Sequence, residues 1–468
     1  MERGRSSLQQ TKAQLAHENR ARVLMRLAWP AIAEQILLTL VSYVDTAMVG
    51  SLGANATAAV AINASPIWLI GGLLQALAVG YSVQVAHRIG ARDVEGARSV
   101  IRQAVLATAC VGISLMGVCL LLAPHLPRWM GAHSAVMADA VAYVRIYVLA
   151  LPMQAGSAVF SAILRCKGDT KTPLLFNTMT NLLNVCLNFL LIYPARTLHL
   201  FGRPVPMWGA GLGVRGAAIA TSLSTGAIGI CLVAVVYLRR DPLRISVRES
   251  YRPDGAIIRR AVSLGIPVAL ERTTISLGQI VMTRITALLG TVALAANHVA
   301  VTAEGMSYLP ASGISFAATT LVGQRVGARA SHEASRYARL SAWFGFAFSA
   351  GMGVLLLLLA HPLAALFSSD DAVVSLAAGM LRIVAVAEPL FGVSIVLGGA
   401  LRGAGDSRFP FFISMVCMWG IRATLAPLLV FALHAGLAGI WIAMAADLCV
   451  RGGLSIWRVW RCRFDARV

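Results

Sequence analysis

A carboxylate, Asp45, stands inside a long apolar stretch near the start of this chain, in the sequence SYVDTAMVG. If that stretch crosses a membrane, the ionised acid is costly to hold there unless it faces a cavity or a partner. An acid in such a place is a candidate for taking up and releasing a cation. The competing interpretation is structural, with Asp45 capping a helix or pairing within a helix bundle.

Three uncharged polar residues stand in later apolar stretches. Asn184 and Asn188 are four residues apart, so on a helix their side chains share one face. Thr221 lies in the next apolar stretch, within GVRGAAIAT. These residues and Asp45 could form one polar cluster. Alternatively, the two asparagines could provide hydrogen bonds that hold neighbouring helices together.

The four polar residues have no polar counterparts in the second half of the chain, which repeats the first. A shift of 237 residues places VAHRIGAR on VGQRVGAR and ILRCKGDTKTP on ALRGAGDSRFP. A later match needs a shift of 223, so the first half carries about 14 extra residues near 194–210. The positions equivalent to the four polar residues are apolar: Met282, Ile421, Leu425 and Met444. We therefore expect the functional asymmetry to lie in the first half.

Two glutamates are shared by both halves. Glu34 and Glu271 correspond at the shift of 237, and each follows a proline by four residues. They could line the mouth of a central cavity and attract cations, or they could pair with nearby arginines. Met282 could line the same cavity, because methionine adapts to many ligands, although ordinary packing explains it as well.

A third glutamate, Glu388, is a further cavity candidate and has no acidic counterpart in the first half. Its equivalent position at the shift of 237 is Leu151. The alternative for Glu388 is an ion-pair network within the second half. The arginines available for that network are Arg284, Arg382 and Arg422.

The elements that position these residues are predicted to be membrane helices. Of the 468 residues, 58% are hydrophobic and 13% are charged, whereas a soluble protein carries about 25% charged residues. The apolar residues form long blocks, so we predict an all-α membrane protein with twelve transmembrane helices. The expected spans are 28–49, 57–84, 100–124, 137–160, 173–193, 212–238, 262–288, 294–320, 338–360, 373–397, 409–433 and 435–459. Pro30 and Pro267 should open the first helix of each half, and Pro152 and Pro389 should bend the fourth and tenth helices.

The formal net charge of +20 indicates how the chain is oriented. Of the 40 Lys and Arg residues, 31 lie in the tails and alternate loops, which is the positive-inside bias and places both termini in the cytoplasm. Six crossings per half give both halves one orientation, as two lobes related by a pseudo-two-fold axis along the membrane normal. The predicted parts are a cytoplasmic tail (1–26), an N-lobe (27–238), a cytoplasmic linker (239–260), a C-lobe (261–460) and a C-terminal tail (461–468).

Two other classes of function are excluded by the sequence. The positive charges sit on loops between apolar spans, so they indicate membrane topology rather than nucleic-acid binding. The spans contain no histidine cluster and no HExxH, GxSxG or paired catalytic carboxylate motif, which argues against an enzyme. No cysteine pair has metal-ligand or disulfide spacing, and we expect no cofactor.

The repeated motifs carry a family resemblance. The segment PAIAEQ…VDTAMVGSLG at 30–53, the two repeated motif pairs and GVRGAAIAT resemble the multidrug and toxic compound extrusion (MATE) family from about residue 24 to 460. The resemblance implies twelve helices in two six-helix lobes around a central cavity. It also implies export of organic compounds, often cationic, driven by inward flow of H⁺ or Na⁺. We expect the protein to be a monomer in the cell membrane.

The resemblance also assigns roles to particular residues. Asp45, Asn184 and Asn188 match the cation site of the family's N-terminal lobe, and Thr221 fits the contribution of its sixth helix. Some relatives have a second carboxylate where Asn188 stands, so this chain favours H⁺, with Na⁺ at Asp45 as the alternative and no other metal.

A second acidic site, found in the NorM-like branch of the family, is not reproduced in this chain. Its seventh- and tenth-helix acids fall on Ile275 and Phe391 here. Glu388, one helical turn from Phe391, could substitute for one of them. The competing function is a flippase for lipid or glycan precursors from the related superfamily, which would favour a strongly cationic cavity.

Overall fold

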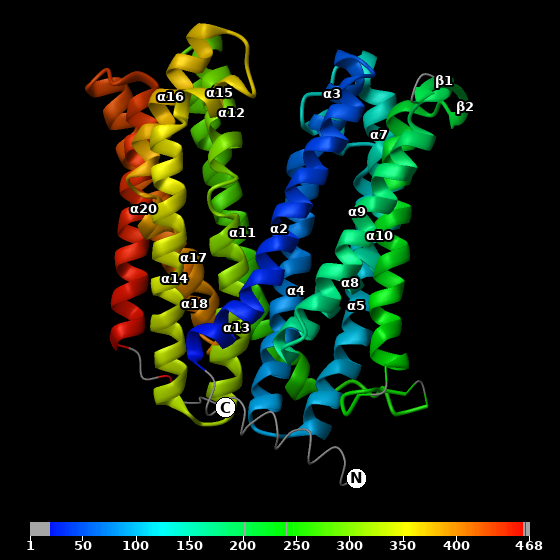
Figure 1. Cartoon of the computed structure of the whole chain (residues 1–468), viewed down its shortest axis with the longest axis vertical. Helices are drawn as coiled ribbons and strands as arrows, with labels where there is room; N and C mark the ends of the chain where they lie inside the picture. Colours follow the sequence, from blue (N-terminus) through cyan, green and yellow to red (C-terminus); the bar gives the residue numbers. More distant parts are fainter. Residues whose placement is uncertain (1–18, 201–202, 240, 247, 462–463, 465–468) are drawn as a thin grey trace.

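The helices of the molecule form two groups that meet at one end and diverge toward the other (Figure 1). The computed structural model describes residues 19–200, 203–239, 241–246, 248–461 and 464. The end at which the groups meet carries the connection between the two halves of the chain, and we call it the linker end. The opposite end carries a β-hairpin, and we call it the hairpin end.

The first group, the N-lobe, is formed by the first half of the chain. Its helices are α2 (Arg20–Gly50), α3 (Ala54–Ala61), α4 (Ala64–Gly90), α5 (Val94–Leu122), α6 (Leu126–Trp129), α7 (Ser134–Leu149), α8 (Leu151–Lys167), α9 (Lys171–Leu191) and α10 (Gly213–Leu238). Strands β1 (Pro194–Leu200) and β2 (Arg203–Ala210) pair antiparallel between α9 and α10. The hairpin accounts for the extra residues that the repeat comparison found near 194–210.

The second group, the C-lobe, repeats this order without the hairpin. Its elements are α11 (Gly255–Ala287), α12 (Thr291–Glu304), α13 (Leu309–Gly327), α14 (Ser331–Leu358), α15 (Ala360–Ala365), α16 (Asp371–Ala385), α17 (Glu388–Gly403), α18 (Arg408–Met415), η1 (Val416–Arg422), α19 (Ala423–Pro427), η2 (Leu428–Ala432) and α20 (Gly436–Arg461). Segments η1 and η2 are π-helical, so the eleventh membrane segment is wound less tightly than its counterpart α9.

Twelve membrane segments follow from these elements. In the described residues, eight helical segments are long and apolar enough to cross a membrane, and two bent pairs raise the number to ten. The other two segments are α11 and the α12–α13 pair, which occupy the places of α2 and α3–α4 in the repeat. Helix α11 carries Glu271, Arg272 and Arg284 in its interior, which lowers its mean hydropathy. The predicted fold class, two six-helix lobes, is confirmed.

The predicted bends in the fourth and tenth helices are present. The pair α7–α8 bends by 51° and the pair α16–α17 by 60°. Pro152 and Pro389 lie in the first turn of α8 and α17, where a missing backbone N–H leaves no hydrogen bond unmade. The proline therefore starts a new helix at each bend.

The predicted positions of Pro30 and Pro267 are wrong, because both lie inside helices. Helix α2 begins at Arg20, within the predicted tail, and α11 begins at Gly255, within the predicted linker. Asn19 and Asp254 cap these helices by accepting hydrogen bonds from backbone N–H groups of the first turn. Each helix is thus extended at the linker end by about two turns beyond the expected span.

These extensions are exchanged between the lobes. Val23, Leu24 and Ile32 of α2 lie in one hydrophobic core with residues of α13, α14 and α17. Conversely, Ile257 and Ala261 of α11 lie in the core of the N-lobe, with residues of α4, α5, α8 and α10. Burial of these apolar side chains explains why the helices continue past their prolines. Each half of the chain completes the core of the other.

The linker is fastened to the N-lobe at α5. Glu249 accepts hydrogen bonds from Arg98 and Arg102, each at 2.5 Å, and the side-chain amide of Gln103 donates to the Arg252 carbonyl at 2.7 Å. These contacts hold the connection on the N-lobe before the chain enters α11.

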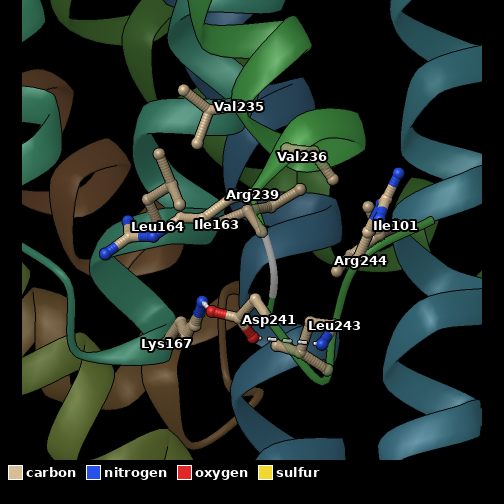
Figure 2. A pocket seen from close by; sticks show the side chains of 10 residues that line it. All are labelled: Ile101, Ile163, Leu164, Lys167, Val235, Val236, Arg239, Asp241, Leu243 and Arg244. Carbon is tan, nitrogen blue, oxygen red and sulfur yellow. Dashed lines mark hydrogen bonds and ion pairs between the residues drawn. The ribbon is translucent and has the colours of Figure 1, made fainter.

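A small apolar cleft opens beside the linker, and an ion pair between Lys167 and Asp241 lies at its edge (Figure 2). The cleft is lined by Ile101, Ile163, Leu164, Lys167, Val235, Val236, Arg239, Asp241, Leu243 and Arg244. It lies at the linker end, whereas Asp45 lies 25 residues into α2, about 38 Å along that helix. The cleft is therefore separate from the candidate site.

Candidate functional site

Asp45 and Asn188 are in direct contact within the N-lobe. Nδ2 of Asn188 donates to Oδ1 of Asp45 at 2.6 Å, and the Asn188 side chain is 1% exposed. The hydrogen bond joins α2 to α9, so residues 143 positions apart in the chain share one polar contact. A short hydrogen bond to an acid is strongest when the acid is ionised.

Asn184 and Thr221 complete this group, which we call the polar cluster. One atom of the Asn184 amide lies 2.6 Å from Oδ1 of Asp45, and the other amide atom lies 3.3 Å from Oγ1 of Thr221. Nδ2 of Asn188 also lies 3.2 Å from the Asn184 amide. The structure therefore brings together all four residues that the sequence placed in this cluster: an acid, two amides and a hydroxyl.

The hairpin end of α2 is fixed next to the polar cluster. The Tyr193 hydroxyl donates to the carbonyl of Met48 at 3.2 Å and lies 2.8 Å from Oγ of Ser51. Tyr193 follows α9, which carries both asparagines. Met48 follows Asp45 by three residues, so this contact anchors α2 within one turn of the acid.

The equivalent place in the C-lobe is apolar. Met282 and Met444 are buried there, and Leu425 packs against the same hydrophobic cluster. The repeat thus gives both lobes the same backbone arrangement at this place, with polar side chains in the N-lobe and apolar side chains in the C-lobe. Met282 is only 5% exposed, which favours the packing interpretation over the predicted role in lining a cavity.

Glu34 and Glu271 are both paired with arginine. Arg165 donates to Glu34 at 2.8 Å, and Asn177 donates to the same acid at 2.7 Å. In the C-lobe, Arg402 donates to Glu271 at 3.1 Å, and Ser414 donates to it at 3.3 Å. The shift of 237 relates Arg165 to Arg402 as well as the two acids.

These ion pairs correspond to the second interpretation of the two glutamates. Glu34 is 3% exposed and its charge is compensated locally. Sequence reasoning did not identify Arg165 and Arg402 as the partners. The signal was available, because both arginines fall in the repeated segment LRCKGD/LRGAGD.

Glu388 has no ion pair among the described residues, so the alternative interpretation, a network with Arg284, Arg382 and Arg422, is wrong for this acid. Both carboxylate oxygens of Glu388 are buried without a hydrogen-bond partner, and the residue is 0% exposed. Arg422 instead pairs with Asp447 at 3.0 Å, and Arg451 binds the same acid at 2.9 Å.

Glu388 therefore lies at a break in a helix rather than in an ion pair. Glu388 is the first residue of α17, directly after the 60° bend. A helix N-terminus carries partial positive charge, which offsets part of the cost of burying this carboxyl. Glu304 is also buried and ends α12 at the other helix break of this lobe.

The donors of the polar cluster suit a proton or a monovalent cation. Among the described residues, no group of three or more His, Cys, Asp or Glu side chains is placed to hold a metal ion. The cluster contains a single carboxylate, together with the buried and unpartnered amide oxygen of Asn188. Divalent ions usually require more oxygen ligands and more negative charge than this.

Comparison with known proteins gives a family match over most of the chain. A family model described as MatE matches residues 30–190 and 267–428, one match in each half. The Thermotoga maritima protein described as a probable multidrug resistance protein NorM is 28% identical over 433 residues, which cover 92% of this chain and 90% of that protein. A Bacillus subtilis protein described as the uncharacterized transporter YisQ is 29% identical over 440 residues, covering 94% of each chain.

Solved structures share the fold. One described as an outward-facing conformation of a multidrug resistance MATE family transporter has a TM-score of 0.87 at 23% identity, covering 96% of this chain and 97% of that one. Another, described as a transporter of the MOP superfamily from Pyrococcus furiosus, has a TM-score of 0.87 at 22% identity, covering 96% and 98%.

Proposed function

Because the chain belongs to the MatE family of membrane transporters, we propose that it exports small organic compounds, often cationic, in exchange for a cation that enters the cell. The drug-resistance descriptions of its relatives support export of foreign compounds. The observation that carries the coupling proposal is the contact of Asp45 with Asn188 at 2.6 Å, inside a cluster that only one lobe possesses.

We infer that the polar cluster serves two states of charge, with the Asn184 amide turning between them. With its nitrogen at 2.6 Å, the amide donates to an ionised carboxylate, and its oxygen accepts from Thr221. With its oxygen there, the carboxyl must carry a proton to make a hydrogen bond, and the amide nitrogen donates to Thr221. Proton uptake by Asp45 would then reverse the hydrogen bonds from Asp45 through Asn184 to Thr221, while Asn188 donates to Asp45 in both states.

We favour H⁺ over Na⁺ as the coupling ion. A sodium ion needs several oxygen ligands at once, and the cluster supplies one carboxylate. In one arrangement of the Asn184 amide, both asparagine nitrogens point at that carboxylate, and in the other only the Asn188 nitrogen does. Binding Na⁺ would require those amides to turn their oxygens inward, whereas binding H⁺ requires only the Asn184 turn.

The coupling acid lies where it can act on the arrangement of the lobes. Helix α2 contacts the C-lobe through Ile32 near the linker end and is anchored to the N-lobe at Met48. Asp45 lies between these two anchors. A change in the charge of Asp45 alters the stability of the contact between α2 and α9. A bound cation shifts the equilibrium between two conformations by the difference in its affinity for them.

For the substrate, we propose that Glu388 attracts cationic compounds. A buried acid without a partner is stabilised by any cation that reaches it. Glu34 and Glu271 are already compensated by arginine, so their predicted part in the cavity has less support. We place the linker end in the cytoplasm, because the positive-inside distribution of Lys and Arg favours that side.

One observation supports the competing flippase function. Arg272 stands in the interior of α11, its side chain is exposed, and no hydrogen bond or ion pair involves it in the described residues. Its equivalent in the N-lobe is Gln35. An unpaired cation in a membrane segment suits an anionic substrate group, such as the phosphate of a lipid precursor.

The test is efflux from proteoliposomes with each gradient imposed separately. We expect a pH gradient alone to drive efflux of a fluorescent organic cation, and a Na⁺ gradient at zero pH difference to drive none. Efflux driven by Na⁺ alone would make Na⁺ the coupling ion. If neither gradient drives efflux and a fluorescent anionic lipid crosses instead, the flippase function replaces export.

A further inference from the structure

Among the hydrogen bonds that cross between the lobes at the linker end, two are related to each other by the internal repeat. Nε2 of His87, on α4, lies 2.8 Å from the carbonyl oxygen of Gly403 at the end of α17. Nε2 of Gln324, on α13, donates to the carbonyl oxygen of Cys166, near the end of α8, also at 2.8 Å. The shift of 237 carries His87 to Gln324 and Cys166 to Gly403. A carbonyl only accepts, so Nε2 of His87 must carry the hydrogen.

The two acceptors are carbonyls that the helix ends leave unbonded. At the end of α8, Gly168 N–H bonds to the Arg165 carbonyl and Asp169 N–H bonds to the Leu164 carbonyl. This is the pairing of a Schellman motif, with Gly168 at a φ of +99°. The motif leaves the carbonyl of Cys166 without a hydrogen bond from the helix end, so this carbonyl needs a partner from elsewhere.

The end of α17 repeats this geometry. Gly405 N–H bonds to the Arg402 carbonyl, Asp406 N–H bonds to the Leu401 carbonyl, and Gly405 has a φ of +90°. The carbonyl of Gly403 is passed over in the same way. In each lobe, the orphan carbonyl of one helix end is satisfied by a side chain from the other lobe.

The backbones of α4 and α13 also approach each other closely, at two positions that the repeat relates. A Cβ added to Gly90 would lie 1.9 Å from the carbonyl oxygen of Gln324, and one added to Gly327 would lie 2.0 Å from that of His87. Only glycine permits α4 and α13 to come this close. The segments HRIGAR and QRVGAR therefore supply both the side chains and the glycines of this contact.

We propose that His87 and Gln324 are positioning residues of the transport cycle, whose crossed hydrogen bonds hold the linker end closed while the hairpin end is open. We call the two bonds the clasp. This inference rests on the proposed export function, in which the site must open to each side in turn. The clasp explains why both repeated motif pairs lie at this end, since one pair donates and the other accepts.

Opening the linker end breaks both bonds of the clasp. A buried hydrogen bond contributes about 1.4 kcal/mol, or tenfold in an equilibrium constant, near the upper end of the usual range. Water reaching the open linker end can solvate the freed carbonyls, so the penalty for opening stays moderate. The clasp therefore biases the closed state without locking it.

Cys166 is a native reporter of the clasp, because it is 3% exposed and lies at one of the two bonds. We would replace the seven other cysteines by alanine and measure the rate at which N-ethylmaleimide labels Cys166 in purified protein in nanodiscs. The cysteines to replace are Cys110, Cys119, Cys186, Cys231, Cys417, Cys449 and Cys462. Labelling in nanodiscs reaches both faces, so the result does not depend on the orientation in the membrane.

We expect His87→Ala and Gln324→Ala each to raise the labelling rate of Cys166 about tenfold, and the double variant to raise it further. His87→Gln should keep the rate near that of the parent, since the second half uses glutamine at this position. Gln103→Ala is the matched control. It removes a side-chain amide that donates to the Arg252 carbonyl at 2.7 Å and accepts from the Asp254 N–H at 3.2 Å, which joins α5 to the linker and does not link the repeated motifs.

A second reporter separates gating from unfolding. Cys119 is 7% exposed within the N-lobe core, and in a chain that retains only this cysteine the clasp variants should not change labelling. Unchanged labelling of Cys166 in the double variant, or equal increases at Cys119 and Cys166, would overturn the clasp. Loss of coupling proposed for Asp45 is measured by efflux, so either proposal can fail while the other stands.

Discussion

Asn188 donates a hydrogen bond of 2.6 Å to Asp45, and the side chain that makes it is almost wholly buried. The equivalent pair in the C-lobe is Leu425 and Met282, which belong to or pack against an apolar cluster. One lobe can therefore change its charge at this position and the other cannot. The coupling to a cation that we propose is therefore assigned to the N-lobe alone.

Replacing Asp45 by asparagine should abolish efflux driven by a pH gradient and leave folding intact. The substitution keeps the size of the side chain and its hydrogen bond to Asn188 while removing the titratable group. Efflux by reconstituted protein checks this, with thermal melting as the measure of folding. Asp139→Asn, at an acid of α7 outside the polar cluster, is the control and should transport at the parental rate. Parental efflux by the Asp45 variant would remove this acid from the mechanism.

Replacing Glu34 by glutamine should destabilise the fold by about 3 kcal/mol, because it leaves the buried Arg165 without its counter-charge. Glu271→Gln should have a smaller effect, since the Glu271 and Arg402 side chains are 15% and 21% exposed and water can reach them. Thermal denaturation of the two purified variants gives the comparison. Restoration of stability by the double change Glu34→Gln and Arg165→Gln would support the ion pair, and equal losses in both lobes would contradict it.

Neutralising either of two equally buried acids of the C-lobe should have different effects on the stability of the fold. Asp447→Asn should lower stability by about 3 kcal/mol, because Arg422 and Arg451 both lose their partner. Glu388→Gln should leave stability unchanged or raise it, since no cation pairs with this acid in the described residues. Melting curves test the contrast. Export assays should show a raised KM of Glu388→Gln for cationic compounds, with neutral compounds as the control; an unchanged KM would exclude Glu388 from substrate binding.

The attachment of the linker should weaken in acid. Burial alone would raise the pKa of Glu249, but hydrogen bonds and positive charge from Arg102 and Arg98 outweigh it and hold that pKa below its ordinary value of 4.5. A carboxyl with a lowered pKa stabilises the folded contact above its ordinary value and loses this contribution as the pH falls through the lowered one. Relative to the intrinsic rate of amide exchange at each pH, hydrogen exchange of residues 241–254 should therefore accelerate below about pH 4.5. In Glu249→Gln this acceleration should be absent and exchange fast at every pH.

The residues of the polar cluster could be predicted because polarity within apolar segments is rare and the repeat supplied an internal comparison. Asp45, Asn184, Asn188 and Thr221 were each set apart from an apolar equivalent. The same comparison located the hairpin, whose residues have no equivalent in the second half. Prolines at bends were predictable too, since Pro152 and Pro389 fall at matching places.

Other features depend on packing that no local pattern carries. Pro30 and Pro267 were expected to start helices, but burial of residues such as Ile32 and Ala261 against the opposite lobe continues those helices past the proline. One interpretation paired Glu388 with an arginine, but Arg422 forms its ion pair with Asp447. Which acid pairs with which arginine depends on distances across helices, and the order of the chain does not encode them.

The exchange of helix ends between the lobes sets an order of events during synthesis. Val23, Leu24 and Ile32 have their core partners in α13, whose first residue, Leu309, is made almost 300 residues later. The start of α2 must therefore wait, without its native neighbours, until most of the protein has left the ribosome. A truncated chain that ends before α11 would also lack Ile257 and Ala261, which complete the core of the N-lobe. Each half thus lacks part of its core without the other, and the native packing is complete only when both halves are in the membrane.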